Sequence, residues 1–253
     1  MHPIDSPRHL RKMRAVLLLC LLFPLAAATA SESFKLDDAP IDTRDVVSIQ
    51  RGAKVFVNYC LNCHSAGAMR YNRLADLGLS ATQIRDNLMF ASDKLGATMS
   101  VAMRAQDAKE WFGVAPPDLS VIARSRGPDW LYTYLRSFYR DDSTASGWNN
   151  VVFPNVGMPN VLWELQGQQI LKVEEGKNGH GTEHVKKLTI AAPGTLGERE
   201  FDALTADLVN YLVFMGEPAR QSRMQIGYAV LIFLGVLFVP VYLLKKDYWK
   251  EVH

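Results

Sequence analysis

Cysteine is scarce in this sequence: the 253 residues contain only three, Cys20, Cys60 and Cys63. Cys20 lies inside an apolar run near the N-terminus, so only the close pair remains for a folded domain. Two cysteines separated by two residues cannot build a disulfide framework. The sequence therefore excludes a disulfide-stabilised scaffold, and the pair requires another chemical role.

An excess of charge of one sign is also absent. Residues 31–225 carry 21 lysines and arginines against 23 aspartates and glutamates, and the basic residues do not cluster. Because a nucleic-acid surface needs clustered basic residues, we expect no nucleic acid among the partners. The chain is 48% hydrophobic and 21% charged, a balance typical of a compact domain and not of a disordered or fibrous protein.

Long apolar runs occur only at the two ends of the chain. The first extends from Ala15 to Ala30, follows a basic stretch and closes with Ala28-Thr29-Ala30. A basic stretch, an apolar run and small residues, in that order, are typical of a secretory signal peptide. We predict that residues 1–30 are removed on export and that Cys20 is removed with them.

The second apolar run extends from Ile226 to Leu244, 19 residues without a formal charge. At about 1.5 Å per residue, a helix of this length covers roughly 28 Å, close to the thickness of the hydrocarbon core. Three lysines follow, which places the C-terminus in the cytoplasm. We predict a periplasmic domain over 31–225, a transmembrane anchor in the lipid of a bacterial inner membrane over 226–244, and a cytoplasmic tail over 245–253.

Helical spacing of apolar residues dominates the exported region. It predicts helices over residues 46–59, 80–91, 104–112, 128–139 and 200–215. Loop signals fill residues 65–72 and 141–162, whereas 168–173 and 187–191 alternate like two strands of a surface hairpin around a glycine-rich link. The predicted fold class is mostly α, with long loops, a small β-hairpin and a C-terminal transmembrane helix.

The close cysteine pair belongs to Cys60-Leu61-Asn62-Cys63-His64, the CxxCH signature of covalent haem c attachment. One turn of backbone sets the two sulfurs at the separation of the two reactive carbons of the haem, and the next residue carries an imidazole to the iron. A zinc site would need further ligands, and the sequence has no second CxxC. A thioredoxin-type redox pair expects a preceding strand, where this sequence predicts a helix.

The second axial ligand of the iron has several candidates outside the predicted leader: His180, His184, His253, Met69, Met89, Met99, Met103, Met158, Met215 and Met224. Met158 leads, because it follows Gly157, which permits close backbone approach, and precedes Pro159, which stiffens the chain. We interpret Met89, Met99 and Met103 as core residues, and His180 and His184 as surface histidines. Met215 and Met224 lie on or after the last helix of the domain, and His253 lies on the cytoplasmic side. An iron held by histidine and methionine transfers electrons without binding substrate, and the soft thioether favours its ferrous state.

Longer motifs carry a resemblance to a known family. They are Ala115-Pro-Pro-Asp-Leu-Ser120, Trp148-Asn-Asn-Val-Val-Phe-Pro-Asn-Val-Gly-Met-Pro159, and Asp207-Leu-Val-Asn-Tyr-Leu-Val-Phe-Met-Gly-Glu-Pro218 before the C-terminal apolar run. On these motifs the sequence resembles the cytochrome c1 family, the haem c subunit of the ubiquinol–cytochrome c reductase (cytochrome bc1) complex. The resemblance covers nearly all of the chain after residue 30 and implies a cytochrome c-like haem domain.

The resemblance also implies roles for individual residues. Cys60 and Cys63 would attach one haem c, and His64 and Met158 would ligate its iron. Arg124 matches a family arginine that pairs with a haem propionate, and Pro117 would form part of the pocket wall.

The implied function is the relay of single electrons from the Rieske iron–sulfur protein to a soluble or tethered cytochrome c, beside cytochrome b. No residue of this chain would act as a catalytic acid or base; the multi-subunit complex catalyses ubiquinol oxidation. Two other functions stay open: a stand-alone tethered cytochrome c that feeds a terminal oxidase, and a haem enzyme or gas sensor with an open iron position.

Overall fold

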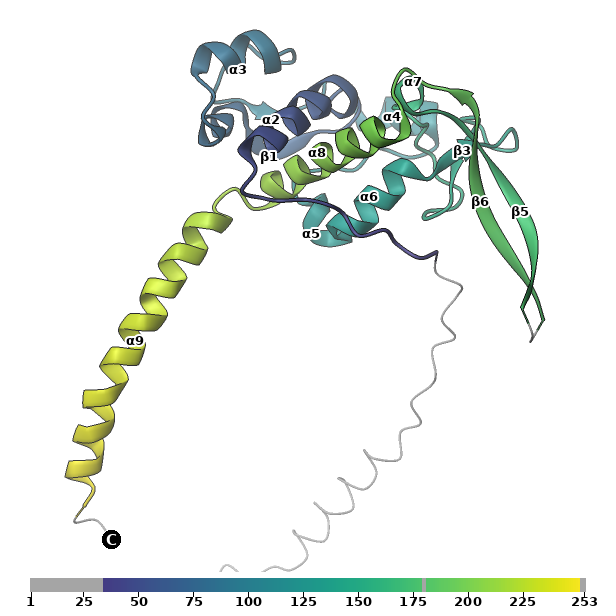
Figure 1. Ribbon diagram of the computed structural model, residues 1–253. Coiled ribbons are helices and arrows are strands. Elements are labelled where there is room, and N and C mark those ends of the chain that lie inside the picture. Colours follow the sequence, from purple (N-terminus) through teal and green to yellow (C-terminus); the bar gives the residue numbers. More distant parts are fainter. Residues whose placement is uncertain (1–33, 179–180, 251–253) are drawn as a thin grey trace, which may run out of the picture. The chain divides into compact units, whose positions relative to one another are not determined.

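A computed structural model describes residues 34–178 and 181–250 (Figure 1), so the predicted leader over 1–30 lies outside the described residues. The helices are α2 (Val46–Val55), α3 (Ala81–Leu88), α4 (Ala105–Phe112), α5 (Ile122–Arg126), α6 (Pro128–Arg136), α7 (Trp163–Gln166), α8 (Glu198–Gly216) and α9 (Arg220–Tyr248), with a π-helical turn η1 (Phe56–Cys60) and a 3-10 helix η2 (Tyr71–Leu77). The strands pair as β1 (Ala66–Arg70) with β2 (Thr98–Met99), β3 (Phe138–Arg140) with β4 (Trp148–Asn150), and β5 (Gly167–Asn178) with β6 (Gly181–Pro193). The mostly α fold class with a β-hairpin is confirmed.

Helices α2 and α8 approach each other closely in the core. A Cβ atom at Gly52 would lie 1.9 Å from the carbonyl oxygen of Asp207 and 2.8 Å from the Cβ of Tyr211, so glycine is required for this approach. One turn further, the rings of Phe56 and Tyr211 lie 5.3 Å apart, and both are fully buried. This contact holds η1, and with it Cys60 at its end, against α8.

Most predicted helices are confirmed. The helix expected over 46–59 is α2 continued by η1, and it reaches Cys60. Those expected over 80–91, 104–112, 128–139 and 200–215 correspond to α3, α4, α6 and α8. The third of these ends early, at Arg136, because Phe138 enters β3 and pairs with Asn150.

The prediction of a loop over residues 65–72 is wrong. Residues 66–70 form β1, which pairs with Thr98–Met99, and Tyr71 begins η2. Ala66 and Met69 are buried on this strand. Its stability depends on a partner strand far along the chain, which local residue preferences do not reveal.

The predicted hairpin is confirmed, and its strands are longer than expected. They pair over residues 167–178 and 181–193. The Gln169 amide fixes the base of the hairpin, because it donates to the carbonyl oxygens of Arg136 and Phe138 at 2.8 and 2.9 Å. Farther out, Val173 and Ile190 are exposed.

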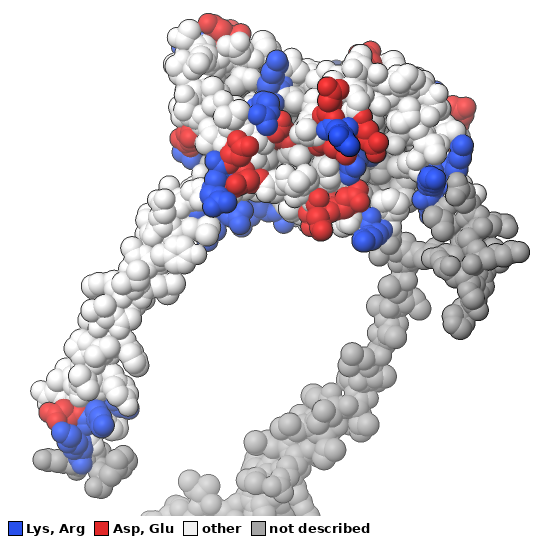
Figure 2. Space-filling view, in the orientation of Figure 1, with Lys and Arg blue, Asp and Glu red and all other residues white. Residues whose placement is uncertain are grey.

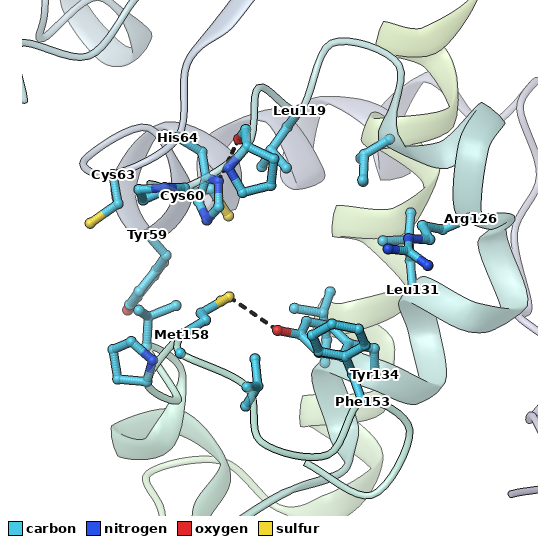
Figure 3. A pocket seen from close by; sticks show the side chains of 18 of the residues that line it. Tyr59, Cys60, Cys63, His64, Leu119, Arg126, Leu131, Tyr134, Phe153 and Met158 are labelled. Carbon is cyan, nitrogen blue, oxygen red and sulfur yellow. Dashed lines mark hydrogen bonds between the residues drawn. The ribbon is translucent and has the colours of Figure 1, made fainter. Parts of the chain in front are cut away.

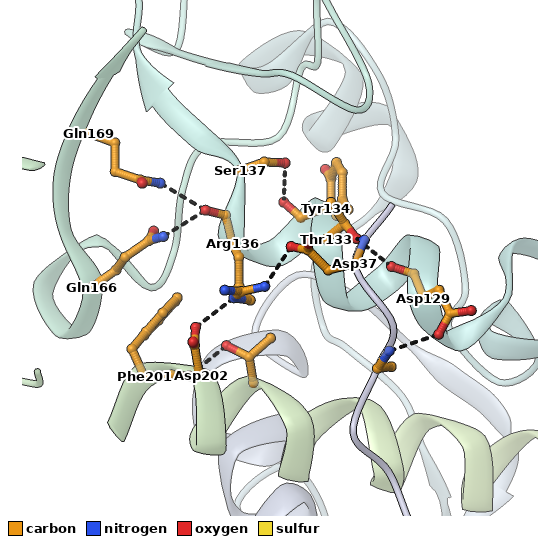
Figure 4. A network of polar contacts seen from close by, with 12 residues as sticks. Asp37, Asp129, Thr133, Tyr134, Arg136, Ser137, Gln166, Gln169, Phe201 and Asp202 are labelled. Carbon is orange, nitrogen blue, oxygen red and sulfur yellow. Dashed lines mark hydrogen bonds and ion pairs between the residues drawn. The ribbon is translucent and has the colours of Figure 1, made fainter. Parts of the chain in front are cut away.

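A network of polar contacts ties α6 to three other segments (Figure 4). The Arg136 guanidinium donates to Asp37 at 2.8 Å and to Asp202 at 2.6 Å. The backbone N–H of Asp37 donates to the Thr133 hydroxyl at 2.8 Å, and the carbonyl of Arg136 accepts from Gln166 at 2.9 Å. The segment before α2, the start of α8 and the region around α7 are therefore all fastened to α6.

None of the residues of helix α9 is buried, although the helix is 29 residues long. Within the described part of the chain, it is the one helix long and apolar enough to cross a membrane. The predicted span over 226–244 lies inside it, but the helix begins at Arg220 and continues to Tyr248. Figure 2 shows uncharged side chains along most of α9, whereas basic and acidic side chains are interspersed on the visible face of the domain.

Candidate haem site

A cavity of about 400 Å³ opens between α5, α6, α8 and the loops that follow η1 and β4 (Figure 3). Its walls are mostly aliphatic and aromatic: Tyr59, Phe112, Val114, Ala115, Pro116, Pro117, Leu119, Ile122, Trp130, Leu131, Tyr134, Leu135, Phe153, Val156, Pro159, Val161, Leu208 and Leu212. Cys60, Cys63, His64 and Met158 also line it. The cavity thus brings Met158 together with Cys60, Cys63 and His64, which precede it by more than ninety positions in the sequence.

The two cysteines lie at the end of η1, where the chain turns back. The N–H groups of Cys63 and His64 both donate to the carbonyl oxygen of Cys60, at 3.1 and 2.9 Å. Burial raises the pKa of the Cys60 thiol to about 12, and burial also raises the pKa of Cys63. A thioredoxin-type pair needs a stabilised thiolate. This environment disfavours one, which argues against the redox reading of the motif.

His64 is oriented by a backbone acceptor. Its Nδ1 lies 2.8 Å from the carbonyl oxygen of Pro117, and because a carbonyl can only accept, Nδ1 carries the proton. Burial lowers the pKa of His64, although this hydrogen bond acts in the opposite direction. The lowered pKa favours the neutral ring. The lone pair is therefore on Nε2, the arrangement that metal-binding histidines adopt.

The segment after Pro117 holds the chain that follows His64. The carboxylate of Asp118 accepts from the N–H of Gly67 at 2.7 Å, and the Ser120 hydroxyl accepts from the N–H of Ala68 at 3.0 Å. Burial raises the pKa of Asp118, but hydrogen bonds from Ser120 and Gly67 outweigh it and leave that pKa below its ordinary value. The histidine and its carbonyl acceptor are thus fixed to each other by several bonds.

Among the methionines that the structure describes, Met158 alone lines the cavity. Its sulfur accepts a hydrogen bond from the Tyr134 hydroxyl at 3.4 Å (Figure 3). A Cβ at Gly157 would lie 2.9 Å from a Val114 methyl and 3.0 Å from the Phe112 carbonyl oxygen, so glycine lets the loop approach closely, as predicted.

The other ligand candidates lie elsewhere or cannot be placed. Met89 and Met99 are buried in the core, as expected of core residues. Met103 does not line the cavity. The His180 and His184 side chains lie outside the described part of the chain.

Two buried asparagines hold the loop that carries Met158. The Asn150 side chain donates to the carbonyl of Tyr134 at 2.8 Å and accepts from the N–H groups of Val152 and Phe153 at 2.9 and 3.1 Å. The side-chain oxygen of Asn149 accepts from the N–H of Asn155 at 2.8 Å. Sequence reasoning missed both residues, because an asparagine in a polar loop gives no signal of burial.

The structure separates the two arginines of α5. Arg124 does not line the cavity; its side chain lies against α8, with Cγ 3.3 Å from where a Gly216 Cβ would be. Arg126 does line it, and its guanidinium carbon lies 5.0 Å from the ring centre of Trp130 and 5.9 Å from that of Phe153. The sequence-based choice of Arg124 for a pocket role therefore does not agree with its position, and Arg126 was missed.

The residues present suit a haem c. The apolar wall suits a flat macrocycle, the thiols lie at the cavity edge, and an imidazole and a thioether come from separate loops. Pro117, expected to act as a wall residue, lines the cavity and also supplies the carbonyl that orients His64. No sequence signal marks such a backbone acceptor.

Comparison with known proteins gives consistent matches. The model of the Cytochrome C1 family matches residues 36–170 and 194–252. The chain is 50% identical over 244 residues to the ammonia monooxygenase gamma subunit of Nitrosomonas europaea (96% of this chain, 100% of the relative). It is 48% identical over 244 residues to cytochrome c1 of Allochromatium vinosum (95% and 100%), and 28% identical over 240 residues to cytochrome c1 of Rhodospirillum rubrum (82% and 83%). The unmatched interval, 171–193, is most of the β5–β6 hairpin.

Proposed function

The chain belongs to the cytochrome c1 family, and on this premise we propose that His64 and Met158 are the axial ligands of its haem. The chain is a haem c electron-transfer subunit of a cytochrome bc1 complex and is anchored in the membrane. The observation that supports the ligand assignment is the single apolar cavity lined by Cys60, Cys63, His64 and Met158.

When bound, the haem supplies an iron that takes up and releases one electron at a time. The chain holds and tunes it. The two cysteine thiols attach it covalently, and the Pro117 carbonyl keeps the Nε2 lone pair of His64 available to the metal. The Met158 sulfur would supply a second ligand to the iron, and the apolar wall would exclude water. With both positions taken, the residues favour electron transfer over substrate binding.

We propose that Arg126, and not Arg124, pairs with a haem propionate. Arg126 combines an exposed guanidinium at the cavity wall with two aromatic neighbours that restrict it. A planar guanidinium suits a carboxylate geometrically and stays charged at all physiological pH values. Its positive charge near the haem disfavours the ferric state.

Arg126→Gln is therefore expected to lower the midpoint potential of the haem by roughly tens of millivolts, since a partly exposed charge is screened. Arg124→Gln, two residues away on the same helix, is the matched control and is expected to leave the potential unchanged. Redox titration of the haem c absorbance in the purified complex measures both. A larger shift in the Arg124 variant would restore the sequence-based assignment.

The finer function follows the family. We propose that the chain accepts an electron from the Rieske iron–sulfur protein and passes it to a soluble or tethered cytochrome c, beside cytochrome b. The haem domain, residues 31–225, would lie in the periplasm of a bacterium, with the C-terminal tail after the 226–244 span in the cytoplasm. A basic stretch ahead of the apolar run of the predicted leader and three lysines after the span support this orientation.

Purification from membranes in mild detergent tests the partners. We expect the tagged chain to retain a b-type haem and a Rieske-type iron–sulfur centre, seen in a reduced-minus-oxidised spectrum and by electron paramagnetic resonance. Recovery with terminal oxidase subunits instead would favour the stand-alone tethered cytochrome. Recovery with a monooxygenase would extend the name of the Nitrosomonas relative to this chain. Ready binding of carbon monoxide by the native ferrous haem would contradict the two-ligand assignment.

A further inference from the structure

Tyr134 has a cavity contact that the relay of electrons does not by itself require. It lies on α6 and lines the cavity. Its hydroxyl donates to the Met158 sulfur at 3.4 Å, within the range of a hydrogen bond to sulfur, and no other hydrogen bond to that sulfur is found among the described residues. The contact joins α6 to a loop 24 residues downstream.

The Tyr134 ring has little freedom to move this hydroxyl. It stacks on Trp130, with ring centres 4.7 Å apart and planes 11° apart, and meets Phe138 edge-on at 5.0 Å and 67°. Aromatic pairs in these geometries add stabilisation beyond the buried area. The hydroxyl is therefore presented from a fixed direction.

The same residue is also bonded to the base of the Met158 loop. The backbone carbonyl of Tyr134 accepts from Asn150, which is fully buried, and the Asn150 side-chain oxygen accepts from two N–H groups of that loop. Tyr134 thus contacts the loop through its main chain and the sulfur through its side chain. A change in the sulfur position would strain both contacts.

We propose that Tyr134 is a positioning residue that orients the Met158 thioether and raises the reduction potential of the haem. The proposal rests on the assignment of Met158 as axial ligand. A hydrogen bond to the sulfur withdraws electron density from the lone pairs that it donates to iron. Ferric iron needs that donation more than ferrous iron does, so the donor selectively destabilises the oxidised state.

Removing the hydroxyl as Tyr134→Phe is expected to lower the potential. The free energy of one neutral hydrogen bond sets the size of the effect. It corresponds to a roughly two- to tenfold fall in the ratio of reduced to oxidised haem at a fixed potential. At about 59 mV per tenfold change for one electron, this is a fall of about 20 to 60 mV. Phenylalanine keeps the stacking on Trp130, so the fold should be retained.

The matched control is Tyr132→Phe, which removes a hydroxyl from the same helix but outside the cavity. We expect no change in its potential. A second variant, with 3-fluorotyrosine placed at position 134 by codon suppression, makes the hydroxyl a stronger donor while preserving the ring. It should raise the potential. Shifts of opposite sign from the two position-134 variants would not arise from loosened packing alone.

The measurement is redox titration of haem c in the full-length chain within its membrane complex. An unchanged potential in Tyr134→Phe, or equal shifts in the Tyr132 control, would overturn the proposal. So would a fluorotyrosine shift of the same sign as the phenylalanine shift. A failure of the ligand assignment can be told apart from a failure of this proposal. If Met158 is not a ligand, Met158→Leu leaves the potential and the sulfur-to-iron charge-transfer absorbance unchanged. If Met158 is a ligand, both change whatever Tyr134 does.

Discussion

Replacing Cys60 and Cys63 together with serine will leave the chain without a covalently attached haem. A serine hydroxyl cannot form the thioether, and both attachment points lie in one turn at the cavity edge. Mass spectrometry of the chain purified from membranes measures the result. The native chain should carry the added mass of one haem, and the double variant should carry none.

The double variant should also be less stable. Haem would cover the apolar wall of a cavity of about 400 Å³. An empty cavity costs roughly 24 cal/mol per Å³, so leaving this one empty would cost about 10 kcal/mol, which is comparable to the whole stability of a typical domain. Water that enters the cavity would reduce this cost. We expect the double variant to accumulate in membranes at a much lower level than the native chain, seen by immunoblot.

Cys20→Ser is the control for this experiment. Cys20 lies in the predicted leader, so this variant should carry one haem, and its mature N-terminus should be Ser31, as in the native chain. Each single variant, at Cys60 or at Cys63, keeps one thiol and can retain one thioether bond. Covalent haem in the double variant, or its absence from the native chain, would contradict the assignment of the motif.

The parts of the site that could be predicted from the sequence are those whose chemistry is local. The CxxCH spacing is contained in one turn, so it is visible without a fold. Met158 stood out because its neighbours Gly157 and Pro159 restrict the backbone, and the structure shows why glycine is needed there. Helices such as α6 and α8 were predictable because each buries a stripe of apolar side chains at helical spacing.

The parts that could not be predicted depend on packing between distant segments. Arg124 and Arg126 are two positions apart on a short helix, so they point in directions about 200° apart. Only the position of α8, where Gly216 meets Arg124, shows which of the two faces the cavity. The strand over 66–70 was missed for the same reason, since its partner is distant.

Tyr134 is both a buried core residue and a hydrogen-bond donor to the cavity. Its spacing along α6 is that of a core residue, and it is indeed buried. Its hydroxyl nevertheless meets the sulfur of Met158, a contact that depends on where the loop after β4 returns. Apolar periodicity reports which face of a helix is buried and says nothing of what the polar end of a tyrosine contacts. The Pro117 carbonyl beside His64 is hidden in the same way, because every residue carries a carbonyl.

Met158→Leu is expected to lower the midpoint potential of the haem by on the order of 0.1–0.3 V, a substantial share of the roughly 0.8 V that axial ligands span. Leucine fills a similar volume but offers no lone pair, and exchanges between these two residues are well tolerated in cores. Water or a harder ligand would then take the position, and such ligands stabilise ferric iron relative to a thioether. The variant should also bind carbon monoxide in its ferrous state, which the native chain should not.

Met89→Leu provides the control for this change, because Met89 is a buried methionine that does not line the cavity. Redox titration and carbon monoxide difference spectra of both variants, in the intact membrane complex, make the comparison. If the Met158 variant kept its potential and excluded carbon monoxide, another residue would have to hold the iron. Tyr134 would then donate its hydrogen bond to a sulfur with no part in ligation. If instead only the Met158 variant changes, the cavity holds the iron between a histidine oriented by a backbone carbonyl and a thioether that accepts a hydrogen bond from Tyr134 of α6.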